Sequence, residues 1–330
     1  MKRPIAIGMM PLPSSACLSD PGYYVWGASM VRDAQGLCHL LYSRWKKEFG
    51  FNAWVTHSGI AHAVSADPLG PYTHVDMALP VRGAGFWDGA CTHNPSVLFH
   101  EGKYYLYYMG NTGDGKPAGS ETSYNWTHRN RQRIGVAVAD SPAGPWNRRD
   151  EPLVDVGAGS LMVSNPAVVA RPDGGFLMIY KEVGTREPLP FGGPVVHRVA
   201  LGEQPVGPFS TRPEPVFTSG TDGFPAEDPF VWVQGRKYRA ILKDMEGRFS
   251  GVERALVLFE SDDGLDWRVA EPCLVSDRTV KLADGTSRRY DYLERPQLHL
   301  EDGMPRILFC AARDGDETFN VHIPLIRECF

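Results

Sequence analysis

Short apolar runs alternate with turn-forming residues along almost the whole chain, and this pattern recurs at a regular interval. Each repeat has a polar approach, usually ending in proline, then an apolar strand, a Gly-containing turn and a second strand. Five segments follow this order: WGASMVRDAQGLCHLLYS from Trp26, HNPSVLFHEGKYYLYYMG from His93, SNPAVVARPDGGFLMIYK from Ser164, EDPFVWVQGRKYRAILKD from Glu227 and ERPQLHLEDGMPRILFCA from Glu294. The prolines stand at 95, 166, 229 and 296, and Ala28 takes the matching place in the first repeat. Intervals of 67, 71, 63 and 67 residues indicate one repeated structural unit.

The second half of each unit also recurs. A third strand and a turn ending in Gly-Pro-aromatic are present in GIAHAVSADPLGPY, RIGVAVADSPAGPW and VVHRVALGEQPVGPF, and ALVLFESDDGLDW varies this pattern. Five units of about 67 residues with four strands each predict an all-β, five-bladed β-propeller that occupies residues 1–330 as a single domain. The fifth unit is short at FNVHIPLI, so we expect the N-terminal RPIAIG (residues 3–8) to supply its outer strand and remove an exposed edge.

The polar approaches to the five first strands should meet in space. In a propeller the first strand of each blade lines the central axis, so the residues before it surround the mouth of the channel. Distant polar groups that converge on one concave place are the usual form of a small-molecule site. We therefore expect these ligand-binding residues at the mouth: Trp26, Arg44, Trp45, His93, Asn94, Asn165, Lys181, Asp228, Asp244 and Arg295.

Composition and charge exclude several classes of protein. The chain has 330 residues and a net charge of −5, and Arg129, Arg131 and Arg133 form only a short patch that we interpret as a solvated loop, so no nucleic-acid partner is expected. No run approaches the roughly 18 apolar residues of a membrane helix. The N-terminal apolar stretch is short and broken by Pro11 and Pro13, unlike a signal peptide, and the six cysteines have no metal spacing. A cytoplasmic protein without a membrane partner is the prediction.

The layout, the turns SADPLGPY and ADSPAGPW, and AEDPF at the fourth repeat resemble the five-bladed propeller glycoside hydrolases of family 43 and their relatives, which cleave arabinans, fructans and neoagaro-oligosaccharides. The resemblance covers nearly the whole chain and implies an oligosaccharide substrate. It also implies an aspartate base in blade one, an aspartate in blade three and a glutamic acid in blade four. Only the last matches, at Glu227. The first repeat begins Trp26-Gly27-Ala28, and Asn165 stands where the third would carry aspartate.

Glycoside hydrolysis needs one carboxylic acid to protonate the leaving oxygen and a second carboxylate as base or nucleophile. We expect Glu227 to be the acid, with a pKa raised by partial burial beside Asp228. Asp88, in GFWDGACTHNP, is the favoured base, and Glu294, which mirrors Glu227, is its competitor. Asp88 could also be a turn residue before glycine, and Glu294 a plain ion-pair partner. His93 is expected to bind a sugar hydroxyl, to donate a proton or simply to be a satisfied histidine.

Two further features favour a sugar ligand. Tryptophans that can stack on sugar faces gather near the expected site: Trp26, Trp45, Trp54, Trp87 and Trp126. The insertion at residues 111–132 interrupts the hairpin rhythm of the second repeat and is expected to fold over the pocket.

The sequence thus predicts a hydrolase that removes a terminal sugar, with inversion. A glycoside phosphorylase is the nearest alternative, since Arg44, Lys181, Lys243 and Arg295 could bind phosphate. The other alternative is a sugar-binding propeller without catalysis. No cofactor is predicted, and no metal ligand either, although some relatives hold a cation in the channel.

Overall fold

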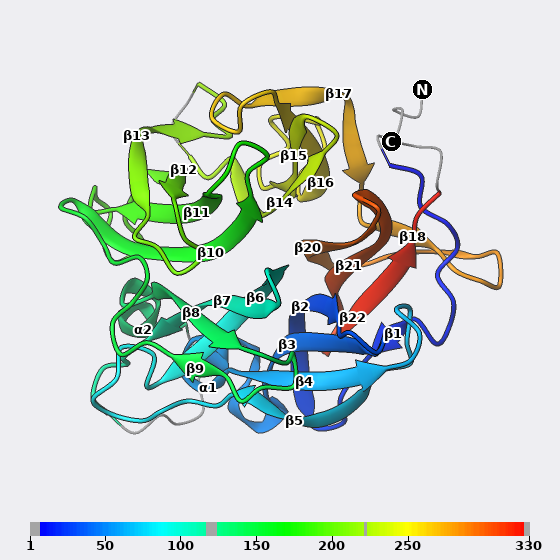
Figure 1. The fold of residues 1–330 in the computed structure, drawn as a ribbon, viewed down its shortest axis with the longest axis horizontal. Coiled ribbons are helices and arrows are strands. Elements are labelled where there is room, and N and C mark those ends of the chain that lie inside the picture. Colours follow the sequence, from blue (N-terminus) through cyan, green and yellow to red (C-terminus); the bar gives the residue numbers. More distant parts are fainter. Residues whose placement is uncertain (1–6, 117–123, 221–222, 327–330) are drawn as a thin grey trace.

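The computed structural model describes residues 7–116, 124–220 and 223–326. Five four-stranded antiparallel sheets surround one central axis, which confirms the predicted five-bladed propeller (Figure 1). The first four blades are each continuous in sequence. They consist of β2 (Tyr23–Arg32), β3 (Cys38–Lys46), β4 (Gly59–Ser65) and β5 (Thr73–Leu79); β6 (Cys91–His100), β7 (Lys103–Asn111), β8 (Arg133–Ala139) and β9 (Asn147–Arg148); β10 (Ser160–Ala170), β11 (Phe176–Gly184), β12 (Val195–Gly202) and β13 (Ser210–Val216); and β14 (Ala226–Gln234), β15 (Lys237–Asp244), β16 (Ala255–Ser261) and β17 (Arg268–Ser276).

The fifth blade joins the two ends of the described chain. It consists of β20 (Tyr292–Glu301), β21 (Met304–Asp314), β22 (Glu317–Pro324) and β1 (Cys17–Leu18), and Cys17 pairs with Val321. The outer strand therefore comes from a later segment than the predicted residues 3–8, of which 3–6 lie outside the described residues. This pairing supplies the outer edge of the last blade and closes the ring.

The remaining elements are short. A hairpin of β18 (Thr279–Lys281) and β19 (Ser287–Arg289) follows blade four, while η1 (Lys47–Phe49), η2 (Phe51–Ala53) and α1 (Trp54–His57) follow β3. Helix α2 (Trp126–Asn130) lies in the insertion of blade two. None of the helices formed by residues 7–116, 124–220 and 223–326 has the length and apolar character needed to cross a membrane.

Burial follows the position of each strand within its blade. The inner strand β3 is buried over all but its last residue, whereas most of the outer strands β5 and β13 is exposed. The core lies between blades, where Trp232 and Ile241 of blade four pack with Leu308 and Val321 of blade five. The near-continuous apolar runs of the inner strands thus reflect packing on both faces.

Each first strand has a register shift at the start of its repeat motif, between Glu227 and Phe230 in blade four and at the matching place in the other blades. In blades two to five a proline, which cannot donate a ladder hydrogen bond, stands at this place, and blade one has the same kind of shift at Ala28 without a proline. The residue before each proline has a positive φ: Asn94 (52°), Asn165 (55°), Asp228 (58°) and Arg295 (55°). Four blades thus bring a polar side chain into the channel by the same local device.

Candidate functional site

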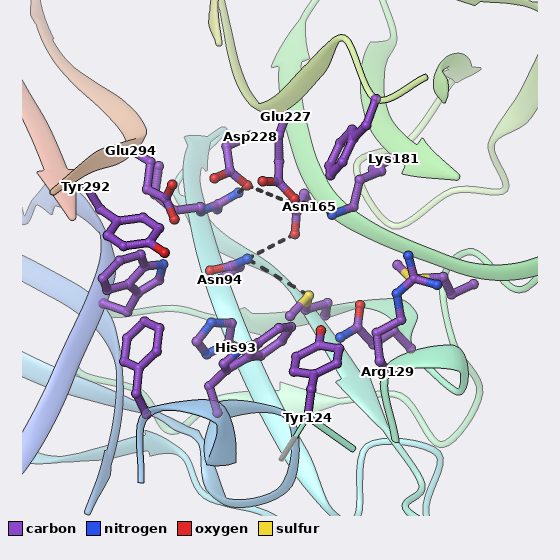
Figure 2. Close-up of a pocket in the computed structure, with 18 of the residues that line it drawn as sticks. His93, Asn94, Tyr124, Arg129, Asn165, Lys181, Glu227, Asp228, Tyr292 and Glu294 are labelled. Carbon is purple, nitrogen blue, oxygen red and sulfur yellow. Dashed lines mark hydrogen bonds and ion pairs between the residues drawn. The ribbon is translucent and has the colours of Figure 1, made fainter. Parts of the chain in front are cut away.

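A cavity of about 300 Å³ lies at the mouth of the channel, and all five blades contribute to its lining (Figure 2). Its volume is at the lower end of the range of about 300–1,000 Å³ that is typical of small-molecule pockets. Most of the residues expected at the site line this cavity: Trp26, Trp45, His93, Asn94, Asn165, Lys181, Glu227, Asp228, Glu294 and Arg295. Trp54 and Trp126, two of the tryptophans expected near the site, line it as well. Residues that the sequence did not single out for binding complete the lining: Phe51, Met109, Tyr124, Arg129, Gln132, Met162, Phe191, Phe224 and Tyr292.

A chain of hydrogen bonds joins the positive-φ residues of four blades (Figure 2). Asn94 Nδ2 donates to Asn165 Oδ1 at 2.9 Å, and Asn165 Nδ2 donates to Asp228 Oδ1 at 2.7 Å. Arg295 Nη1 donates to the same Asp228 oxygen at 3.2 Å. In blade one Gly27 leaves room for Arg295, because an added Cβ would lie 3.2 Å from its Cγ. Asn165 both accepts and donates here, which an aspartate carboxylate in its place could not do.

Two lysines and two glutamates on blades three to five form a second, charged cluster at the pocket. Lys181 Nζ lies 2.6 Å from Glu227 Oε1, and Lys243 Nζ lies 2.8 Å from Glu227 Oε2. Lys243 Nζ is also 2.5 Å from Glu294 Oε2, so one ammonium group binds both carboxyl groups. Lys243 stands opposite Glu227 in the register of β14 and β15, which explains why the two side chains meet.

The two glutamates have pKa values shifted in opposite directions although they occupy equivalent places. Burial alone would raise the pKa of Glu227, but the charges and hydrogen bonds of Lys181 and Lys243 outweigh it and hold that pKa well below 4.5. Burial raises the pKa of Glu294, against the single charge of Lys243, and the neighbouring Asp228 and Glu227 raise it further. The predicted raised pKa of Glu227 is therefore wrong, because two lysines on second strands face it. The raised pKa belongs to Glu294.

Aromatic side chains and His93 form the blade-one and blade-two side of the pocket. The His93 ring stacks on Trp54 with centroids 4.8 Å apart, and its Nδ1 lies 2.7 Å from Ser58 Oγ. Burial, with a smaller effect of Arg295, holds the pKa of His93 well below 6.5. The imidazole is therefore neutral at pH 7 and suited to hydrogen bonding with a ligand hydroxyl.

The described part of the insertion covers one side of the pocket, as the sequence predicts. Asn125 Oδ1 accepts from the His128 N–H and caps α2, whose residues Trp126 and Arg129 line the cavity with Tyr124. Arg129 is only 8% exposed, so its predicted place in a solvated loop is wrong. It is held by Trp126 and by Phe191 of the blade-three loop, which sequence periodicity alone could not reveal.

Asp88, the favoured base, is outside the cavity. It is fully buried, and its carboxylate bonds to Arg82 at 2.7 Å, Arg148 at 3.3 Å and Tyr108 Oη at 2.8 Å. Trp87 stacks on Tyr108 beside it and is also absent from the cavity lining. Asp88 is therefore engaged in an ion-pair network away from the channel mouth, and its predicted position over the pocket is wrong.

Arg44 and Asp244 are also outside the cavity. Arg44 pairs with Asp20 at 2.9 Å and stacks over Tyr23, and it lines a different cavity. Asp244 accepts backbone N–H bonds from Arg248, Phe249 and Ser250, and so fixes the loop after β15. Their side chains turn to these partners, which corrects their predicted place in the binding site.

The structure brings no metal-binding cluster together within its described ranges. The three pocket carboxylates bond to lysine, arginine and asparagine groups.

No family model and no curated protein matches the chain. Solved structures share its fold. One described as a glycoside hydrolase has a TM-score of 0.70 at 17% identity, covering 98% of this chain and 92% of that one. A family 117 glycoside hydrolase from the marine bacterium Zobellia galactanivorans has a TM-score of 0.65 at 14% identity, covering 98% and 89%. A GH43_1 enzyme from Xanthomonas citri, complexed with xylotriose, has a TM-score of 0.57 at 16% identity, covering 94% and 90%. The resemblance seen in the sequence is confirmed at the level of the fold.

Proposed function

We propose that this protein is a glycoside hydrolase that removes a terminal sugar from an oligosaccharide. The observation that carries the proposal is a pair of carboxyl groups on one wall of the pocket with pKa values shifted in opposite directions. Paired titratable groups whose environments separate their pKa values are the usual mark of acid and base roles. The shared propeller fold of glycoside hydrolases supports the same class of reaction.

Glu294 is the general acid in this proposal, in place of Glu227. Its raised pKa keeps the carboxyl proton available for the glycosidic oxygen as the bond from that oxygen to the anomeric carbon breaks. Glu227 stays ionised beside Lys181 and Lys243 and is the second carboxylate. Among the described residues, no bond joins Asn94, Asn165 or Arg295 to Glu227 or Glu294. These three residues position Asp228, whose negative charge helps to raise the pKa of Glu294.

The shape of the pocket supports action on chain ends. The insertion of blade two and Phe191 from blade three wall the cavity on one side, and Trp26 and Tyr292 line it as well. A small pocket of this kind accommodates a terminal unit more readily than the middle of a chain, which requires an open groove.

The spacing of the two carboxyl groups bears on stereochemistry. Glu227 Oε2 and Glu294 Oε2 are 2.8 Å and 2.5 Å from the same Lys243 nitrogen, so these oxygens are no farther apart than those two distances together. This favours the spacing of about 5–5.5 Å of retaining enzymes over the roughly 6.5–9.5 Å of inverting ones. The inversion favoured from the sequence stays a prediction, and the anomer of the first product, measured by proton NMR, decides between the two.

The test is sugar release from a panel of plant and algal oligosaccharides, with and without inorganic phosphate. We would compare wild type with Glu294→Gln and Glu227→Gln, and use Glu214→Gln, an exposed position on β13, as the matched control. Loss of the general acid should lower kcat by about 10²–10⁴-fold. Replacing the ionised carboxylate should have a similarly large effect, whereas Glu214→Gln should leave the rate unchanged.

The two alternatives give different results in the same experiment. Sugar release that requires phosphate and yields a sugar phosphate would identify a phosphorylase. Binding of an oligosaccharide without turnover by the wild-type protein would identify a sugar-binding propeller. Wild-type rates from Glu294→Gln would contradict the assignment of Glu294 as the acid.

A further inference from the structure

Arg129 differs from the other cations of the pocket. Lys181, Lys243 and Arg295 each pair with a pocket carboxylate. Arg129 lines the same cavity and is only 8% exposed, yet no carboxylate of the described residues forms an ion pair with it. Glu227 acts on it only through space. A buried guanidinium without a carboxylate bonded to it is costly, so its retention in a pocket indicates a ligand that supplies that partner.

The geometry leaves one edge of the Arg129 guanidinium for such a ligand. Its Nη1 donates to the Phe191 carbonyl oxygen and to Asn130 Oδ1, both at 2.8 Å. No bond between residues of the described ranges uses Nε or Nη2, the pair of donors that matches the two oxygens of a carboxylate. Gln132 lines the same cavity and is 2% exposed, and its Nε2 likewise has no acceptor among the residues described.

The charge balance of the site points in the same direction. Three carboxyl groups (Glu227, Asp228, Glu294) face three cations in the lining (Arg129, Lys181, Arg295), and Lys243 bonds to the cluster as a fourth cation. The site therefore carries an excess of positive charge, although the whole chain has a net charge of −5. Such a pocket favours an anionic ligand over a neutral one.

The place of Arg129 distinguishes two sources of that negative charge. In Figure 2, Arg129 and Glu294 lie on opposite sides of the pocket. A phosphate that attacks the anomeric carbon would have to reach that carbon between Glu294 and Glu227, the two carboxyl groups that share Lys243. A carboxylate carried by the sugar itself can instead lie on the far wall. The arrangement favours the sugar carboxylate.

We propose that the sugar held in this pocket is a uronic acid whose carboxylate binds the free edge of Arg129, with Gln132 as a second donor. The proposal rests on the proposed function in placing a sugar in the pocket, and it names the substrate class. Trp126 and Phe191, which hold the guanidinium at 5.6 Å and 5.5 Å from their ring centroids, are positioning residues for it.

The test measures binding, so it does not depend on turnover. Calorimetric titration of the Glu294→Gln variant would compare methyl glucuronide and methyl galacturonide with methyl glucoside and methyl galactoside. Inorganic phosphate and a sulfated methyl galactoside are the further arms. We expect one uronide to bind at least about tenfold more tightly than its neutral counterpart, which corresponds to a charged hydrogen-bonded pair.

The same titrations in Glu294→Gln combined with Arg129→Gln should abolish this preference and leave the neutral sugars unchanged. Arg131→Gln, at an exposed position of the same insertion, is the matched control and should keep the preference. Equal binding of acidic and neutral sugars, a preference that survives Arg129→Gln, selective binding of phosphate or the sulfated sugar, or no uronide binding at millimolar concentration would each overturn the proposal. Hydrolysis of neutral oligosaccharides by wild type would leave the proposed hydrolase intact while the uronate proposal fails.

Discussion

Two sides of the pocket are built from equivalent positions of the same repeat, yet they carry different side chains. On blades one and two these positions hold Trp26 and His93, which lie among aromatic rings. On blades four and five they hold Glu227 and Glu294, which share Lys243. The same local backbone thus presents flat surfaces for a ligand on one side and ionisable groups on the other. In the proposed function, this difference separates binding from proton transfer around the ring.

Disrupting the charged cluster on blades four and five should have the largest effect on stability. Lys243→Met would leave the buried Glu294 and the half-buried Glu227 without their shared partner, and removing one member of a buried ion pair typically costs about 3–5 kcal/mol of unfolding free energy. Denaturant unfolding measures the loss, with Lys103→Met, whose partner is the exposed Asp140, as the control. A loss no larger than that of the control would show that the cluster is not held by Lys243.

Substitution of Asp88 tests whether catalysis depends only on the charged cluster at the pocket. Asp88→Asn should weaken its bonds to Arg82 and Arg148 and lower the free energy of unfolding by about 2–3 kcal/mol. Because Asp88 is outside the cavity, kcat of the folded variant should stay within about twofold of wild type. A loss of kcat comparable to that of Glu294→Gln would return Asp88 to the active site.

A substitution on the aromatic side of the pocket should weaken substrate binding. Trp54→Ala removes the ring that stacks on His93 and lines the cavity, so KM should rise about tenfold with kcat little changed. Phe99→Ala, which truncates an exposed aromatic side chain, is the control. A fall in kcat with unchanged KM would contradict the separation of binding from chemistry.

The opposite pKa shifts also predict a pH dependence of stability. Glu227 has a lowered pKa, so its stabilisation is present above pH 4.5 and is lost as the pH falls through its folded value. Glu294 has a raised pKa, so its stabilisation is present below pH 4.5 and is lost as the pH rises through its folded value. Each shift of one pKa unit corresponds to about 1.4 kcal/mol.

Unfolding free energies measured from pH 3 to pH 7 check both directions. Glu227→Gln should remove part of the acid-side loss, and Glu294→Gln should remove part of the decline above pH 4.5. The same slope changes in both variants would contradict the opposite assignments. The same measurements on Glu214→Gln give the change that replacing an exposed glutamate causes.

The repeated motif explains how much of the site the sequence could predict. Because each motif breaks strand pairing at the same place, the positions of Glu227, Asp228, Glu294 and Arg295 around one mouth follow from the sequence interval alone. The insertion at 111–132 was recognisable because it interrupts that interval. Its buried Arg129 was not, since arginine in a polar segment gives no sign of the neighbour that covers it.

The sequence by itself determined the five blades, the order of the strands in the first four and the motif residues that reach the channel mouth, because a local pattern repeated along the chain specifies all three. Tertiary structure alone decided which carboxyl group has the raised pKa and that Asp88 and Asp244 lie outside the cavity. Those outcomes depend on distances between residues far apart in the chain, such as Glu294 and Lys243, and electrostatic interactions change steeply with distance and burial. That is why equivalent glutamates in neighbouring blades came to have opposite pKa shifts.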